Sequence, residues 1–394
     1  MTTPLIIATC VLLLFAYVFD LTSHRSKIPS VVLLIGLGFV VKLLTELFGV
    51  RLPDFSMALP LFGTIGLILI VLEGALDLEV SREKLPFIGR AALVSVVPLL
   101  AFSFAFAFVL QWATGAGMQQ CLANAIPLSV ISSAVAIPTA ATFKKADRDF
   151  VVYESSISDI IGVIFFNFVT LNDNIDYVSV FDFVGEFTLM IVISLVATVL
   201  LGVLLAKITH HVKYIPVTLA IILIYAVSKE LHLPALVFIL FFGLFLGNLE
   251  RMPIVSGLSQ IGKDQRDREV NSFHDMVRET TFLIRALFFL LFGFVIESSE
   301  LLDGQTILWS LGIVGGIFLL RSIVLLVVRQ PLRPLLFVAP RGLITILLFL
   351  GLPLTQRLDI VGRSMIIQVI ILCALMMMIG SMTVQPRKNG TVID

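Results

Sequence analysis

Apolar residues in this 394-residue chain gather in long runs that are separated by short polar segments. Because a helix needs about 20 apolar residues to cross the hydrocarbon core of a bilayer, the runs predict thirteen membrane-spanning helices and an all-α polytopic membrane protein. The first six cover about 4–19, 28–49, 57–79, 89–113, 119–142 and 148–171. The other seven cover about 180–207, 214–231, 233–248, 272–297, 306–328, 334–353 and 363–384.

Composition narrows the class of protein further. Hydrophobic residues make up 58% of the chain and charged residues only 14%, against roughly a quarter charged in soluble domains, which excludes a soluble globular protein. The 27 basic residues balance the 27 acidic ones, so no nucleic-acid partner is indicated. The three cysteines form no metal-ligand or disulfide pattern, and no Walker A sequence is present. We therefore expect neither a cofactor nor ATP-driven transport.

The basic residues between the predicted helices indicate an orientation. Eighteen lie in one set of loops and four in the other, and basic residues gather on the cytoplasmic side of membrane proteins. This predicts an integral protein of the cell (inner) membrane with its N-terminus outside and its C-terminus in the cytoplasm. The predicted outer loops hold Arg51, Lys229, Arg357 and Arg363. The predicted cytoplasmic loops hold Arg25, Lys27, Arg82, Lys84, Arg90, Lys144, Lys145, Arg148, Lys207, Lys213, Arg251, Lys263, Arg266, Arg268, Arg329, Arg333, Arg387 and Lys388.

Two of the predicted helices are interrupted. The fifth, 119–142, carries Pro138 after a cluster of serines, and the twelfth, 334–353, contains Ala339-Pro340-Arg341-Gly342. A proline in mid-span removes a backbone hydrogen bond, and neighbouring hydroxyl groups can satisfy the freed backbone. These are the fifth helix of helices 1–6 and the fifth of helices 8–13, and one linking helix gives the two halves opposite orientations. Interrupted helices in matching positions of inverted repeats indicate the substrate site of a secondary transporter.

The sixth predicted helix carries an acidic stripe. At about 100° per residue, Glu154, Ser155, Ser158, Asp159 and Gly162 fall on one face, and mainly apolar residues cover the rest of the helix. A carboxylate at membrane depth costs about 2.5 kcal/mol or more unless it faces a cavity or a partner. Two carboxylates on one face therefore predict an ion pathway; the alternative is an ion pair that only holds helices together.

Five segments together resemble a known family. The sequence 154–159, Glu-Ser-Ser-Ile-Ser-Asp, is similar to the Glu-Ser-Leu-Leu-Asn-Asp motif of the sodium/proton exchanger branch of the monovalent cation:proton antiporter superfamily. Residues 341–345 resemble its Leu-Arg-Gly-(Ala/Leu)-Val motif, and 319–324 resemble its arginine-bearing helix. Residues 28–34 and 72–78 match early segments of the family. The resemblance spans nearly the whole chain and implies an antiporter-like fold with two inverted six-helix repeats and crossed broken helices.

The chain departs from the family pattern at two places. Ser158 stands where the family has an asparagine or a first aspartate. The Thr-Asp-Pro of the family's first broken helix has no counterpart, and Ser132 or Ser133 stands at about the place of its aspartate. The site is therefore poorer in carboxylates than is usual in the family. The resemblance implies sodium as the transported ion, while the residues leave potassium and lithium open.

The resemblance also implies a role for each residue of the ion site. Asp159 is the expected carrier of both the cation and the proton. Burial favours the neutral form of a carboxyl group, so protonation and cation binding exclude each other. The hydroxyl groups of Ser155, Ser158, Ser132 and Ser133 are candidate oxygen ligands of the metal cation at Asp159.

Other charged side chains are expected near the site. Glu154 is expected to pair with Arg321, because a guanidinium group is a permanently charged and bidentate partner. Arg341 is expected to satisfy exposed carbonyl groups of the broken helices. Arg285 either pairs with Glu73 or lines the cavity, and the sequence leaves both possibilities open.

These features predict a secondary antiporter, not an enzyme, that exchanges a monovalent cation for protons by alternating access. Because only Asp159 is left to titrate, we expect electroneutral exchange. A core within about 89–171 and 306–384 moves against a scaffold within about 4–79 and 180–297, in one transport domain without a soluble domain. The resemblance implies a homodimer in the lipid bilayer.

Two other classes of protein share features of this sequence. The first is a sodium-coupled symporter of a small organic anion, which uses a similar broken-helix fold. The second is an intramembrane aspartyl protease, which needs a second aspartate facing Asp159, and no other predicted span has an aspartate in mid-helix.

Overall fold

A computed structural model describes residues 2–382 except 27, 50–57, 79, 81–82, 141–142, 173–176, 208–213, 232, 234, 249–262 and 302. Every regular element in this part of the chain is a helix, which confirms the predicted all-α fold. The α-helices are α1 (Thr2–Ser26), α2 (Ser30–Leu47), α3 (Ala58–Asp77), α4 (Leu85–Thr114), α5 (Met118–Ser129), α6 (Ser133–Ala140), α7 (Lys145–Leu171), α8 (Tyr177–Lys207), α9 (Tyr214–Glu230), α10 (Ala235–Gly247), α12 (Lys263–Val295), α13 (Ser298–Leu301), α14 (Gly304–Val327), α15 (Leu343–Gly351) and α16 (Arg363–Met382). The 3-10 helices η2 (Leu335–Phe337) and η3 (Leu354–Gln356) flank α15.

Most predicted ranges agree with a described helix to within a few residues. The clearest differences are α1, which continues to Ser26, and α12, which begins at Lys263 instead of 272. The extra turns are polar or charged, so the hydropathy pattern did not include them. Among the described residues, seven helical segments are long and apolar enough to cross a membrane, and two shorter apolar helices accompany them. The count of thirteen spans and the inverted repeat remain predictions.

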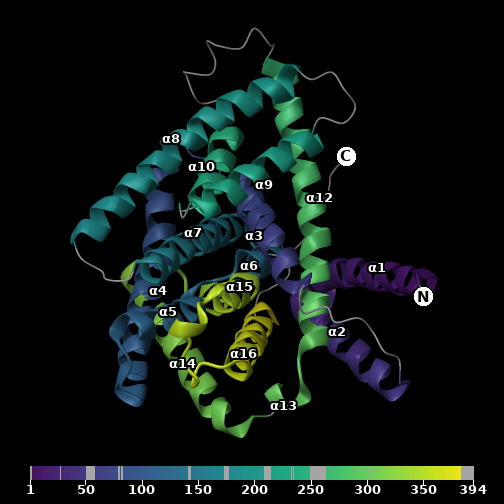
Figure 1. Cartoon of the computed structure of the whole chain (residues 1–394), viewed down its shortest axis with the longest axis vertical. Coiled ribbons are helices and arrows are strands. Elements are labelled where there is room, and N and C mark those ends of the chain that lie inside the picture. The colour runs from purple at the N-terminus through teal and green to yellow at the C-terminus, as the bar shows by residue number, and fades with distance from the viewer. Residues whose placement is uncertain are drawn as a thin grey trace, which may run out of the picture.

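The helices pack mainly within two sets. The α7 set consists of α4, α5, α6, α7, α14, α15 and α16, and the α12 set consists of α2, α3, α8, α9, α10 and α12. The sets meet where α3 contacts α6, α7 and α15 and where α10 contacts α7. In Figure 1, α12 runs most of the height of the view, and α6, α7 and α15 lie near its middle. The interrupted elements are therefore at the centre of the molecule.

The first break lies at residues 130–132, between α5 and α6. The sequence predicted that Pro138 interrupts the helix. This prediction is wrong, because Pro138 lies inside α6. A proline at position 138 leaves the carbonyl group of Ala134, four residues earlier, without its helical donor. That carbonyl oxygen lies 3.4 Å from Nη1 of Arg285, which donates to it from α12. The helix therefore continues through the proline.

The second break occupies residues 338–342, between η2 and α15. The predicted helix 334–353 is only half present: α15 follows the break, but the single 3-10 turn η2 precedes it. Three prolines within ten residues explain the difference, because each lacks the N–H group that an α-helix needs. They are Pro331, Pro334 and Pro340.

Candidate functional site

The two breaks touch each other at the centre of the fold. The backbone N–H group of Ser132 donates to the carbonyl oxygen of Pro340 at 2.9 Å. Gly342 makes this approach possible, since a Cβ atom there would lie 3.0 Å from Oγ of Ser132 and 2.8 Å from Cγ2 of Val135. The crossing thus depends on a glycine at the start of α15.

Arg341 lies at the C-terminal end of α5, where helix carbonyl groups have no donor within the helix. Its Nε donates to the oxygen of Leu128 at 2.9 Å, and its Nη2 donates to that of Ser129 at 3.0 Å. Nη1 donates to the oxygen of Ala339 at 2.8 Å. The side chain is 3% exposed. Its charge faces the negative end of the α5 dipole, and both breaks supply oxygens to it.

Asp159 lies at the opposite half of the first break, beside the N-terminus of α6. Its Oδ2 accepts a hydrogen bond from the backbone N–H of Ser133 at 3.1 Å. Oγ of Ser158 accepts from the N–H of Ile131 at 2.9 Å. A helix N-terminus stabilises a carboxylate through its free N–H groups and its dipole. The carboxylate is held there without a cationic side chain among the described residues that contact it.

One oxygen of this carboxylate is free. Oδ1 of Asp159 is buried and has no hydrogen-bond partner among the described residues, and the same holds for the hydroxyl groups of Ser132, Ser156 and Thr345. Asp159 is 2% exposed. Buried polar atoms are satisfied in nearly all proteins, so the unpartnered carboxylate oxygen indicates an occupant such as a proton, a cation or water.

Ser155 lies one turn before Asp159 on α7 and is also buried. Its hydroxyl group donates to the carbonyl oxygen of Val151 at 2.7 Å, which leaves its own lone pairs available to a ligand. Gly162, one turn after Asp159, is packed against the first break, since a Cβ atom there would lie 2.3 Å from Cγ2 of Val130. Ser158, Asp159 and Gly162 of the predicted stripe therefore face the first break and the start of α6.

Glu154 and Arg321 form a buried ion pair between α7 and α14. Nη2 of Arg321 lies 2.9 Å from Oε2 of Glu154, and Nη1 bonds the other carboxylate oxygen. Nε and Nη2 of Arg321 also donate to the carbonyl oxygen of Leu335 at 3.0 and 2.7 Å. Both charged side chains are about 1% exposed. The pair is the one expected from the sequence, and it adds a contact to η2 that the sequence did not indicate.

A charged cluster on the facing helices α3 and α12 was missed by the sequence analysis. Oδ1 of Asp77 lies 3.1 Å from both Nε2 of His274 and Nη2 of Arg278. Oε1 of Glu73 lies 3.8 Å from Nε of Arg278. Arg285 acts on Glu73 electrostatically, but its hydrogen bond goes to α6. The signal in the sequence is the i, i+4 spacing within each helix.

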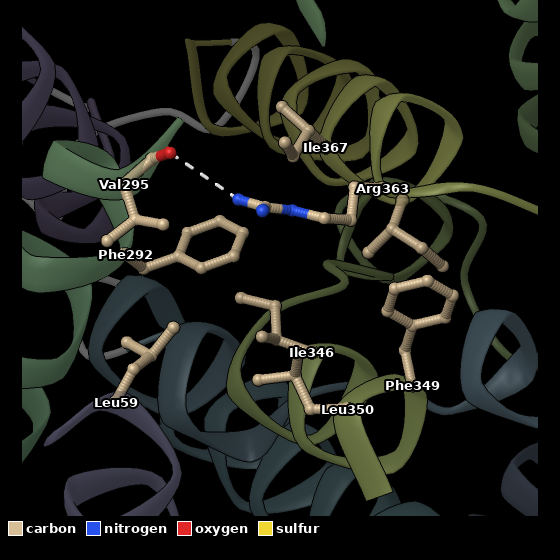
Figure 2. A pocket seen from close by; sticks show the side chains of 9 residues that line it. Leu59, Phe292, Val295, Ile346, Phe349, Leu350, Arg363 and Ile367 are labelled. Atoms are coloured by element: carbon tan, nitrogen blue, oxygen red, sulfur yellow. Dashed lines mark hydrogen bonds between the residues drawn. The ribbon is translucent and has the colours of Figure 1, made fainter. Parts of the chain in front are cut away.

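The other end of α12 borders a mainly apolar cavity of about 120 Å³ between α3 and α12 on one side and α15 and α16 on the other. Figure 2 shows Arg363 reaching across it from α16 to the backbone oxygen of Val295, 3.4 Å away. Nε of Arg363 also lies 3.2 Å from Oε1 of Glu300. One side chain thus links the α7 set to the end of α12.

The chemistry that these residues allow is limited. A single unpartnered carboxylate oxygen with nearby hydroxyl groups suits a proton or a hard cation of low charge, because hard cations prefer oxygen ligands. The described residues contain no group of three His, Cys, Asp or Glu side chains that could hold a metal ion. They therefore offer no site of the type that zinc and other transition metals use.

Comparisons with known proteins give the family and the fold of the chain. The chain matches the family model described as "Sodium/hydrogen exchanger, transmembrane" over residues 10–387. A solved structure of the sodium proton antiporter MjNhaP1 from Methanocaldococcus jannaschii at pH 8 aligns with 96% of this chain and 100% of its own, at 17% identity and a TM-score of 0.72. An electron-microscopy structure of the same antiporter aligns with 97% of this chain and 96% of its own, at 19% identity and a TM-score of 0.70. No curated protein matches the chain.

At these identities the two structures establish a shared fold. The family model covers nearly the whole chain. The protein therefore belongs to the sodium/hydrogen exchanger family, whose members are membrane transporters and not enzymes.

Proposed function

We propose that this protein exchanges a monovalent cation, sodium, for protons across the cell membrane, with Asp159 carrying each in turn. The observation that supports the proposal is the free, buried Oδ1 of Asp159 beside the N-terminus of α6. A carboxylate in this place needs an occupant, and a proton and a cation compete for the same oxygen. Competition for one group couples the two fluxes without further machinery.

The other site residues have supporting roles in this proposal. Ser155, Ser158, Ser132 and Ser133 supply hydroxyl or backbone groups around the ion. The hydroxyl oxygens of Ser132 and Ser155 have lone pairs that accept no hydrogen bond from a described residue.

The charged neighbours of the site are structural in this proposal. Glu154 and Arg321 hold α7 against α14, and Arg341 holds the two breaks together through carbonyl oxygens. None of these three side chains changes its charge during transport, so one proton is exchanged for each monovalent cation.

The transport cycle is proposed to be alternating access, in which the α7 set moves as the core against the α12 set as the scaffold. The helices of each set contact one another more extensively than they contact the other set, and this supports the division. The charge distribution of the loops supports an N-terminus outside and a C-terminus in the cytoplasm. Assembly as a homodimer is part of the same proposal.

Purified protein in proteoliposomes with an internal pH-sensitive dye tests this function. An inward sodium gradient should drive proton efflux, and Asp159→Asn should abolish it, because an amide neither binds a proton at neutral pH nor balances a cation. Asp359→Asn is the matched control: it makes the same change at an exposed aspartate near the start of α16. Sodium uptake that releases no protons but requires an organic anion would instead establish a symporter.

A further inference from the structure

A deep apolar groove runs between α4 and α14, on the α7 set and away from the ion site. Its volume is about 550 Å³, and every lining residue is apolar or glycine. Phe102 and Phe106 stack with ring centroids 5.7 Å apart and form the α4 wall. On α14 the surface is recessed at Gly312 and Gly316; a Cβ atom at Gly312 would meet nothing within 4 Å.

The groove opens onto the surface of the protein that faces lipid. Both helices are among those long and apolar enough to span a membrane. The rim residues Val109, Leu308 and Leu319 are 43%, 74% and 62% exposed. In a membrane protein such an apolar surface is covered by hydrocarbon rather than water. The groove is therefore continuous with the bilayer interface.

We propose that the acyl chain of a membrane lipid occupies this groove. The lining offers no charged side chain, and its only side-chain hydrogen-bonding group is the indole N–H of Trp309. A flexible hydrocarbon chain fills an irregular apolar groove and gains the packing contacts that a void forfeits.

An acyl chain in this groove is close to the charged centre of the fold. Phe102 also lines a small inner cavity that it shares with Ser129, Arg321 and Arg341. Phe102 therefore borders both the groove and the cavity beside the two buried guanidinium groups. The acyl chain covers the side of Phe102 that faces the groove. It thereby keeps water in the groove from reaching the Glu154–Arg321 pair.

Tryptophan fluorescence can test the occupant directly, because the chain has only two tryptophans. Trp309 lines the groove, and Trp112→Phe removes the other one. The single-tryptophan protein is reconstituted in phosphatidylcholine vesicles with increasing fractions of phosphatidylcholine brominated on its acyl chains, since bromine quenches tryptophan on contact. Gly312→Leu fills the groove. Gly315→Leu is the matched control, since Gly315 is exposed on the same helix, has the same open space at its Cβ position and does not line the groove.

If an acyl chain occupies the groove, brominated lipid quenches Trp309, and Gly312→Leu lowers the quenching by about half because the groove-facing side of the indole ring loses its lipid contact. Gly315→Leu leaves the quenching unchanged. Protein that is extracted mildly also retains at least one more phospholipid per chain than the Gly312→Leu variant does, as phosphorus analysis of folded, monodisperse samples would measure. Equal quenching in all three proteins would overturn the proposal. An absence of quenching in the parent protein would show that a protein surface covers the groove.

Discussion

At the scale of single residues, the two buried arginines are neutralised in different ways. Arg321 is paired with a carboxylate, whereas Arg341 is surrounded by backbone oxygens of both breaks. Removing one partner of a buried pair leaves a lone charge, and this costs more than removing both partners. Among the described residues, no carboxylate bonds the guanidinium group of Arg341, so this arginine has no partner whose removal would have a comparable effect.

This difference gives a test of the Glu154–Arg321 pair. Glu154→Gln and Arg321→Ala should each lower the stability by about 3–5 kcal/mol, and the double variant should lose clearly less than the sum of the two. Thermal unfolding in detergent, followed by intrinsic fluorescence, measures all four proteins of the cycle. Additive losses would show that the two side chains act independently. Recovery will not be complete, because the oxygen of Leu335 loses its donors along with Arg321.

A second prediction at this scale concerns Gly342. The Ala side chain in Gly342→Ala would meet Ser132 and Val135 at 3.0 Å or less, so the crossing of the breaks must widen. We expect a loss of about 1–3 kcal/mol, as for other overpacked sites, and slower sodium-driven proton exchange. Gly351→Ala on the same helix, where nothing lies within 4 Å, should change stability by less than about 0.5 kcal/mol. Similar behaviour of the two variants would contradict the close approach.

At the scale of elements, α6 shows what the sequence could and could not predict. The serine cluster is a local signal and indicated an interruption near the observed break, whereas Pro138 lies inside α6. The position of the break was missed since its backbone groups bond to Ser158 and Pro340, which are distant in the chain. The stripe on α7 was predictable from periodicity. Its proximity to the N-terminus of α6 required the tertiary structure.

The link between Pro138 and Arg285 is also testable. Arg285→Met leaves the carbonyl oxygen of Ala134 unpaired, which should cost about 1–3 kcal/mol. In a Pro138→Ala background, the restored N–H group can bond the same oxygen, so the cost of Arg285→Met should fall. Thermal unfolding of the four proteins measures this coupling. An equal loss in both backgrounds would mean that Arg285 stabilises α6 in another way, and Arg285→Lys distinguishes a role of its charge.

At the scale of the whole molecule, the charges near the centre determine whether transport moves net charge. Under the proposed function, Glu154 and Arg321 cancel, Arg341 keeps its charge, and one proton or one monovalent cation neutralises Asp159 equally. The site therefore carries the same charge in both loaded states. A protein that moves the same charge in both directions performs no net electrical work.

Exchange should accordingly be insensitive to membrane potential. Moving one elementary charge across 100 mV is worth about 2.3 kcal/mol, and here no net charge moves. Initial sodium-driven rates in proteoliposomes clamped with valinomycin and potassium gradients should agree at all potentials. Rates that change several-fold with the clamp would require a second titrating carboxylate, and Glu73→Gln would then identify whether it is the one on α3.

The hydrogen bonds from Arg341 to the end of α5 also have a consequence for biosynthesis. The carbonyl groups of Leu128 and Ser129 receive their donors from Arg341, and Leu128 is separated from it by 213 residues. At about 5–20 residues per second, a ribosome needs roughly 10 to 40 s to make that stretch. During this interval the carbonyl groups of Leu128 and Ser129 lack the donors that Arg341 provides. An unpaired backbone group costs several kcal/mol in hydrocarbon. A chain that ends between the first break and Arg341 lacks these donors permanently. We therefore expect premature stop codons in this stretch to give products that membrane quality control degrades.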